Sequence, residues 1–291
     1  MRVTLLGTGC PVAHPRRGGA ATLIEGGGAR VLVDCGSGVT QALVAAGCKG
    51  AEVDALVVTH LHSDHLVDFY QLVISSWHQG RDRPWVVHCP EPVIPVLEGM
   101  MAVWEDERAL RISWEARSST AGLELEIHPL TEGRAVELGG LTLDPVLVEH
   151  QPVEPAFGFV IRGDGHIAVL SGDTARCEAL IAAGRGCDLL VHEVYLHREM
   201  GSKTGTRSVK TLERVASYHT LSSEVGAVAT AMEAKALALT HFVPPVFDAP
   251  ALIREVAASY AGPVLIGEDG MAIDLGGGTV AHGSVIARVL R

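Results

Sequence analysis

The sequence predicts an α/β protein in which two mixed β-sheets are stacked and helices cover the outside. Three observations support this fold class. Short apolar runs of strand length recur along the chain, and longer runs with helical periodicity stand between them. Each half of the chain shows strands followed by helices, as expected for two stacked layers. Of the 291 residues 47% are hydrophobic, so a single domain spanning residues 1–291 can bury a large core.

The predicted elements follow one another in a regular order. Expected strands cover residues 3–6, 21–25, 30–34, 55–58, 124–128, 141–150, 167–170, 189–191 and 236–240, and edge strands are expected in the glycine-rich tail from residue 265. Expected helices cover residues 40–46, 66–76, 96–109, 175–183, 222–234 and 249–260. Glycine and proline make a turn-rich loop of residues 7–19.

A dense group of metal-ligand residues follows the strand at 55–58. The motif H-x-H-x-D-H places His60, His62, Asp64 and His65 on a loop at the carboxyl end of a buried strand. Imidazole nitrogens and carboxylate oxygens are ligands of zinc and similar divalent ions. His60 and His62 can bind one ion, and Asp64 and His65 can bind a second. A chance grouping of ordinary loop residues is a much weaker explanation.

Other predicted strands also end in histidine or aspartate. These residues are His150, Asp173, His192 and His241. One such residue means little, and Asp173 could instead cap the helix at 175–183. The repetition predicts that several strand ends converge on one metal centre.

Asp34, at the end of the third predicted strand, has two equally supported interpretations. Its carboxylate could accept a hydrogen bond from a metal-binding imidazole and so orient that ring. It could instead cap the helix at 40–46.

All four tryptophans lie close together in the sequence. Trp77, Trp85, Trp104 and Trp114 fall in a proline-rich stretch after the metal motif. Ordinary core packing explains some of these rings, but a cap over the site lined with indole explains the clustering better. Residues 69–128 are therefore predicted to form a cap or insert segment.

The charge of the chain predicts that nucleic acid is an improbable partner. The formal net charge is −11, whereas proteins that bind nucleic acid usually carry a basic patch. The one local excess of cations lies within residues 198–214, which could be a solvated loop or a lid that attracts anions.

The remaining composition predicts a cytoplasmic protein. Six scattered cysteines without a C-x-x-C pair indicate reduced, buried thiols. No apolar stretch approaches the roughly 20 residues that span a bilayer, and the first residues do not form a signal peptide.

Together these motifs resemble the metallo-β-lactamase superfamily, and within it the ribonuclease Z and arylsulfatase-like branch. The residues that carry the resemblance occur in the order of the family. They are Leu6-Gly7-Thr8-Gly9, Asp34-Cys35-Gly36, the motif of residues 59–65, His150, Ser171-Gly172-Asp173-Thr174, Val191-His192-Glu193, Tyr218-His219-Thr220 with Glu224, and Leu239-Thr240-His241.

The resemblance implies an αββα sandwich with a dinuclear metal site at one edge. One ion is expected on His60, His62 and His150. A second is expected on Asp64, His65 and His241. Asp173 is expected to bridge two divalent ions, with zinc preferred over manganese or iron. The resemblance also implies that Asp64 orients or deprotonates the attacking water and that His219, positioned by Glu193, protonates the leaving group.

Two departures from ribonuclease Z shape the expected function. The chain lacks the long basic arm that grips tRNA in that family, and its net charge is negative. The expectation is therefore a hydrolase of a small ester-like substrate, such as a sulfate ester, phosphodiester or lactone. The alternative is a ribonuclease Z-type endonuclease that processes the 3′ end of tRNA. A metal-binding or redox scaffold without activity is disfavoured by His219 and Glu193, and a homodimer is left open.

Overall fold

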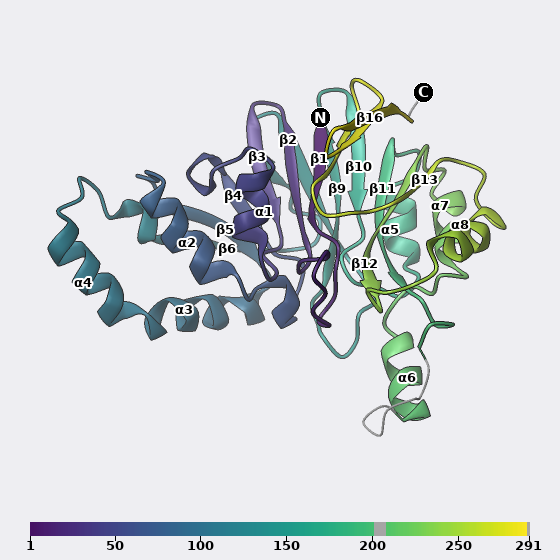
Figure 1. Ribbon diagram of the computed structural model, residues 1–291, viewed down its shortest axis with the longest axis horizontal. Coiled ribbons are helices and arrows are strands. Elements are labelled where there is room, and N and C mark those ends of the chain that lie inside the picture. Colours follow the sequence, from purple (N-terminus) through teal and green to yellow (C-terminus); the bar gives the residue numbers. More distant parts are fainter. Residues whose placement is uncertain (201–207, 290–291) are drawn as a thin grey trace.

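The predicted two-sheet fold is confirmed by a computed structural model that describes residues 1–200 and 208–289. Two mixed sheets stand face to face in the middle of the molecule, with helices on both outer sides (Figure 1). The first sheet has the strand order β16-β15-β14-β1-β2-β3-β4-β5-β6, and the second has the order β13-β12-β11-β10-β9-β8-β7.

The strands of the first sheet are β1 (Arg2–Gly7), β2 (Ala21–Gly26), β3 (Ala29–Val33), β4 (Ala55–Val57), β5 (Trp85–Cys89), β6 (Leu125–Pro129), β14 (Met271–Asp274), β15 (Thr279–His282) and β16 (Val285–Arg288). Those of the second sheet are β7 (Val136–Leu138), β8 (Leu141–Leu147), β9 (Phe157–Gly163), β10 (His166–Leu170), β11 (Leu189–Tyr195), β12 (Leu237–Val243) and β13 (Val264–Ile266). The central strands are apolar throughout because both of their faces are buried.

Helices shield the outer faces of both sheets. They are α1 (Val39–Ala45), α2 (Phe69–His78), α3 (Ile94–Val103), α4 (Glu105–Glu115), α5 (Glu178–Ala183), α6 (Val209–Ala216), α7 (Val225–Ala231) and α8 (Ala249–Ala257). Short 3₁₀ turns are η1 (Gly50–Glu52), η2 (Ser63–His65), η3 (Glu91–Val93) and η4 (Ala121–Leu123). Helices α1–α3 pack on the first sheet, and α5, α7 and α8 pack on the second. A separate apolar core, which includes Leu5, Val33 and Phe159, fills the space between the sheets.

The strand directions create one edge at which a site can form. Strands β3 to β6 are parallel to one another, and so are β10 to β13. Each set therefore presents its carboxyl ends together. The backbone N–H of Phe157, at the start of β9, donates to the carbonyl of Thr59 at 3.0 Å and links the loop after β4 to the second sheet.

Several predicted boundaries differ from the structure. The helix expected at 96–109 is two helices, because the backbone turns at Trp104 between α3 and α4. Strands β5, β7 and β9 and helix α6 were not predicted. In the tail, β13 and β16 are edge strands as expected, but β14 pairs with β1 inside the first sheet.

The tryptophans do not form the indole-lined cap that was predicted. Trp77 and Trp85 are 2% and 0% exposed and pack in the core between the first sheet and its helices. Trp104 and Trp114 are 48% and 89% exposed on the outer helices, and Trp104 stacks on Tyr70. Two parts of the segment 69–128 are the sheet strands β5 and β6. Tryptophans that are close together in the sequence can therefore pack between a sheet and its outer helices, or lie exposed on those helices, without covering a site.

All six cysteines are free and buried, as expected. Within residues 1–200 and 208–289, none of the helices is both long and apolar enough to cross a membrane.

Candidate metal centre

The H-x-H-x-D-H motif forms the loop that leaves β4. The chain ends the strand at Val57 and then turns through η2, which contains Asp64 and His65. Backbone bonds fix this turn: the N–H of Asp34 donates to Val57 at 2.8 Å, and that of Cys35 donates to the carbonyl of His65 at 2.7 Å. The motif is thus held against the end of β3.

Three imidazole nitrogens face one another in the first ligand group. His62 Nδ1 lies 3.0 Å from His60 Nε2 and 3.1 Å from His150 Nε2. His150 Nδ1 is 2.9 Å from the carbonyl of Tyr218, which can only accept, so this nitrogen carries the proton and Nε2 presents a lone pair. His60 Nδ1 likewise contacts Thr59 Oγ1 at 2.9 Å. Lone pairs converging at such distances fit a bound cation.

The second ligand group joins Asp64, His65 and His241. His241 Nε2 is 3.2 Å from Asp64 Oδ2, and His65 Nε2 is 3.7 Å from the same oxygen. His65 Nδ1 donates to Asp34 Oδ2 at 2.8 Å, while its Nε2 is buried without a hydrogen-bond partner in the described chain. A buried nitrogen without a hydrogen-bond partner suits a metal ligand.

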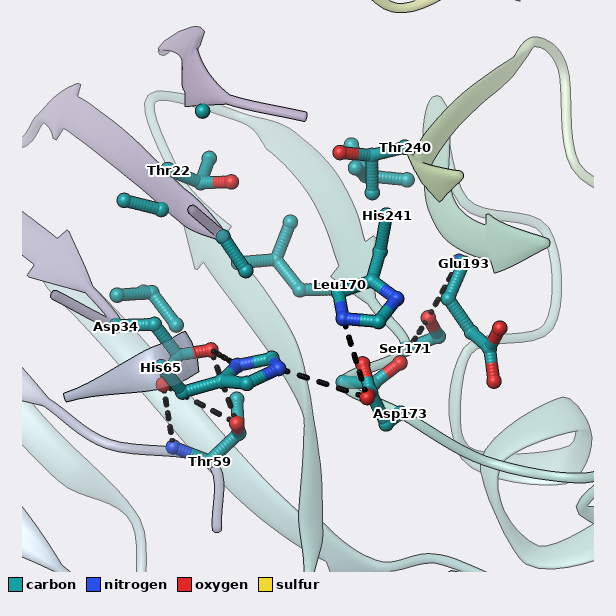
Figure 2. Close-up of a pocket in the computed structure, with 16 residues that line it drawn as sticks. Thr22, Asp34, Thr59, His65, Leu170, Ser171, Asp173, Glu193, Thr240 and His241 are labelled. Atoms are coloured by element: carbon teal, nitrogen blue, oxygen red, sulfur yellow. Dashed lines mark hydrogen bonds and ion pairs between the residues drawn. The ribbon is translucent and has the colours of Figure 1, made fainter. Parts of the chain in front are cut away.

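Asp173 lies between the two groups. Its Oδ2 is 3.8 Å from His60 Nε2, 3.5 Å from His65 Nε2 and 3.3 Å from His241 Nε2. Figure 2 shows this carboxylate between the rings of His65 and His241. The helix α5 is capped by Cys177 and begins further along, so Asp173 is not its N-cap.

These seven side chains form a cluster that can bind metal ions. The ligand atoms of His60, His62, His150 and Asp173 lie within 4.8 Å of one another, and so do those of Asp64, His65 and His241. The geometry brings together all seven residues that the family resemblance assigned to the two metal ions.

The protonation of the first ligand group suits cation binding, whereas in the second group burial is outweighed by the charges of Asp173 and Asp34, which raise the pKa of His65. Burial lowers the pKa values of His60, His62 and His150, which keeps these rings neutral with free lone pairs. Burial alone would raise the pKa of Asp173, but His241 and His65 outweigh it and hold that pKa well below its usual value. The carboxylate is therefore ionised.

His219 and Glu193 form a buried pair beside the cluster. Nδ1 of His219 lies 2.7 Å from Glu193 Oε1. Burial disfavours the imidazolium, but the charges of Glu193, Asp173 and Asp64 outweigh it and raise the pKa of His219 to about 9. A ligand atom of His219 also lies within 4.8 Å of ligand atoms of Asp173 and His241, so this ring is close enough either to bind a metal or to reach a substrate.

The two interpretations of Asp34 are now separated. Its carboxylate accepts from His65 and from the backbone and hydroxyl of Thr59 (Figure 2). Helix α1 instead starts at Gly38, and Asp68 accepts from the backbone of Thr40 at 2.7 Å. Asp34 therefore orients a ring of the cluster and caps no helix.

His192 does not join the site, although it was counted among the converging strand ends. Strand β11 continues through it, and alternate residues of a strand face opposite sides. Glu193 faces the cluster, so the buried ring of His192 faces the outer helices.

Three contacts of the site were not predicted. Thr59 ties Asp34 to His60, the carbonyl of Tyr218 holds His150, and Tyr195 stacks on His219 at 6.0 Å. A backbone carbonyl has no sequence signal. The contacts of the Thr59 and Tyr195 side chains depend on which strands lie next to each other, and a single sequence motif does not reveal that pairing.

Space for a substrate adjoins the cluster. A cavity of about 40 Å³ lies among Thr22, His65, Asp173 and Glu193, between the sheets. A larger groove of about 630 Å³ runs from Asp64 along the loop 10–19, past Arg16 and Arg17. The groove reaches the cluster at Asp64.

The family model described as a β-lactamase superfamily domain matches residues 29–242. The chain belongs to the metallo-β-lactamase superfamily. Ribonuclease Z of Mycobacterium bovis (strain BCG / Pasteur 1173P2) is 33% identical over 274 residues, which cover 92% of this chain and 96% of that protein. The predicted membership of this superfamily is confirmed. The prediction that the chain is a hydrolase of this superfamily is confirmed as well.

Solved structures of the superfamily share the fold. The metallo-β-lactamase fold protein YhfI from Bacillus subtilis has a TM-score of 0.72 and 20% identity, covering 94% of this chain and 99% of its own. The short form of human tRNase Z has a TM-score of 0.70 and 21% identity, with the same coverage.

The prediction that nucleic acid is an improbable partner is wrong. It is overturned by relatives named ribonuclease Z that match nearly the whole chain. The physical reason is that net charge averages over the surface, whereas a polyanion responds to the local field near the site.

Proposed function

We propose that the chain is a metal-dependent endoribonuclease of the ribonuclease Z type, which processes the 3′ end of tRNA. The observation that supports this most is the full-length similarity to ribonuclease Z. The complete ligand cluster and the adjacent Glu193–His219 pair agree with it.

The ligand cluster is assigned to two divalent ions. His60, His62 and His150 would hold one, and Asp64, His65 and His241 would hold the other, with Asp173 shared between them. The five imidazoles favour zinc, and manganese and iron are the alternatives. The pair of ions would supply Lewis acidity to the water nucleophile and to the phosphate.

The protein side chains supply the proton transfers. Asp64 lies where the cluster meets the groove, so its carboxylate can orient the attacking water and accept a proton from it. As the water oxygen bonds to phosphorus, the bond from phosphorus to the leaving oxygen breaks. Protonated His219, held through Nδ1 by Glu193, then donates its other proton to that oxygen.

The test uses a precursor tRNA with a 3′ trailer and the metal-replete protein. We expect a single cut at the boundary of the trailer, loss of cleavage with a chelator, and a large loss in the His219→Ala variant. His166→Ala is the matched control, since His166 lies at the opposite end of β10 from Asp173. Hydrolysis of an aryl sulfate without any cleavage of the RNA would refute the proposal.

A further inference from the structure

Helix α6 is directly connected to the proposed proton donor. It starts at Ser208, whose Oγ accepts from the backbone of Thr211 at 3.1 Å, and it ends at Ser217. Tyr218 and His219 follow at once. Figure 1 shows α6 projecting from the end of the second sheet, away from the other helices.

One side of α6 is anchored to the site. The hydroxyl of Tyr195 donates to the carbonyl of Leu212 at 3.4 Å. Val215 and Ala216 pack against the small apolar cluster that contains Tyr195. The ring of Tyr195 stacks on His219 with an interplanar angle of 8°. The position of α6 is thus fixed relative to His219.

The other side of α6 carries two cations. Lys210 and Arg214 are exposed, stand one helical turn apart, and make no ion pair with any residue of the described chain. Glu213, also exposed, is the only acid on the helix. By contrast, Arg198 in the preceding segment is paired with Glu255 at 3.0 Å.

This arrangement has a cost in the free protein. Like charges four residues apart on a helix repel each other and destabilise it. An anion bound between the two side chains would remove that repulsion. In a chain of net charge −11, exposed cations on a helix that leads directly to the proton donor are also where a polyanion can be held.

From these contacts we infer that α6 binds the phosphate backbone of the RNA substrate outside the metal centre, through Lys210 and Arg214. The inference rests on the proposed function. It identifies the part of the surface that compensates for the negative net charge. The partner is a phosphodiester backbone and not a base, because the helix presents charge and no aromatic face on which a base could stack.

The experiment measures RNA binding as a function of salt. Binding of the precursor tRNA is followed in the His219→Ala background, so that the RNA stays intact. Lys210→Gln with Arg214→Gln should lower the magnitude of the slope of log K against log salt by about 1.4–1.8 and weaken binding roughly tenfold at 0.15 M salt. The exchange Lys210→Arg with Arg214→Lys keeps both charges and should bind like the parent.

Two controls make the result specific. Lys49→Gln with Arg254→Gln removes two exposed cations elsewhere and should leave the slope unchanged. With His219 restored, the α6 double variant should hydrolyse bis(p-nitrophenyl) phosphate at the parental rate. An unchanged slope, or an equal change in the Lys49 and Arg254 variant, overturns the inference. If the α6 double variant lowers the slope but the protein with His219 intact does not cleave the RNA, α6 is still an RNA-binding helix and the proposed function is refuted instead.

Discussion

Asp34 has no predicted ligand role, yet its carboxylate organises the centre of the site. It accepts from His65 and twice from Thr59, and an asparagine amide cannot accept at both positions. Asp34→Asn should therefore weaken metal binding by about 10–100-fold, as measured by competition with a chromogenic chelator. Asp54→Asn, a carboxylate far from the cluster, is the control. An affinity equal to that of the parent would mean that the ring of His65 needs no such support.

His219 tests the division between metal binding and proton transfer. His219→Ala should lower turnover about 10²–10⁴-fold because the leaving oxygen loses its donor. Metal content by elemental analysis should stay at the parental level, since Asp173 and His241 keep their other contacts. Loss of metal from the variant would assign the ring to the ligand set.

The residues of the cluster could be predicted because ligand chemistry is local. Four ligands in the motif of residues 60–65 reveal a site without any knowledge of the fold. Asp34 could not be assigned, because a carboxylate after a strand suits a cap and a hydrogen-bond acceptor equally. His192 was misplaced for a related reason: the end of β11 is set by pairing with β12, and that pairing extends past the apolar run.

At the scale of elements, β5 and β6 carry a pH-sensitive contact. His88 and His128 are opposite each other in these strands, and their rings stack at 5.0 Å. Burial and the neighbouring His128 lower the pKa of His88 to about 4. The unfolded chain, in which histidine titrates near 6.5, therefore binds the proton first. Stability from this group is present above pH 6.5 and is lost as the pH falls toward 4.

His88→Gln should remove that loss. The parent should lose about 1–2 kcal/mol more than the variant between pH 6.5 and 4, a loss reduced by solvent screening of the half-buried ring, as measured by urea unfolding with a chelator present. His282→Gln, an exposed histidine, should follow the parent. Parallel pH profiles for the parent and His88→Gln would show that the half-buried ring does not titrate in this range.

Strand β5 and helix α6 were missed for different physical reasons. β5 has buried residues at alternate positions, but its tryptophan and the prolines around it suggested a cap. Its place in the sheet depends on pairing with β4 and β6, which are distant in the sequence. α6 has an apolar side on which Val215 and Ala216 pack, but none of its residues is fully buried, and the charges within residues 198–214 favoured a loop or lid.

At the scale of the whole molecule, the metal ligands join the two sheets. The motif of residues 60–65 follows β4 of the first sheet, whereas His150, Asp173 and His241 belong to the second. Ions bound to both sets should stabilise the folded state by about 4 kcal/mol at a thousandfold excess over Kd. Chelation should lower Tm by roughly 10 °C, and added metal should restore it. An unchanged Tm after complete removal of metal would contradict the link between the sheets.

The unequal burial of the four tryptophans gives the protein an internal optical reporter. Acrylamide should quench the exposed Trp114 and Trp104 in the native state, whereas emission from Trp77 and Trp85 should stay protected until the helices leave the first sheet. Replacing Trp114 with phenylalanine should remove most of the quenchable, red-shifted emission and leave the protected component. The two populations then report separately on the outer helix and on the core, so that loosening of α4 can be distinguished from global unfolding in a single titration.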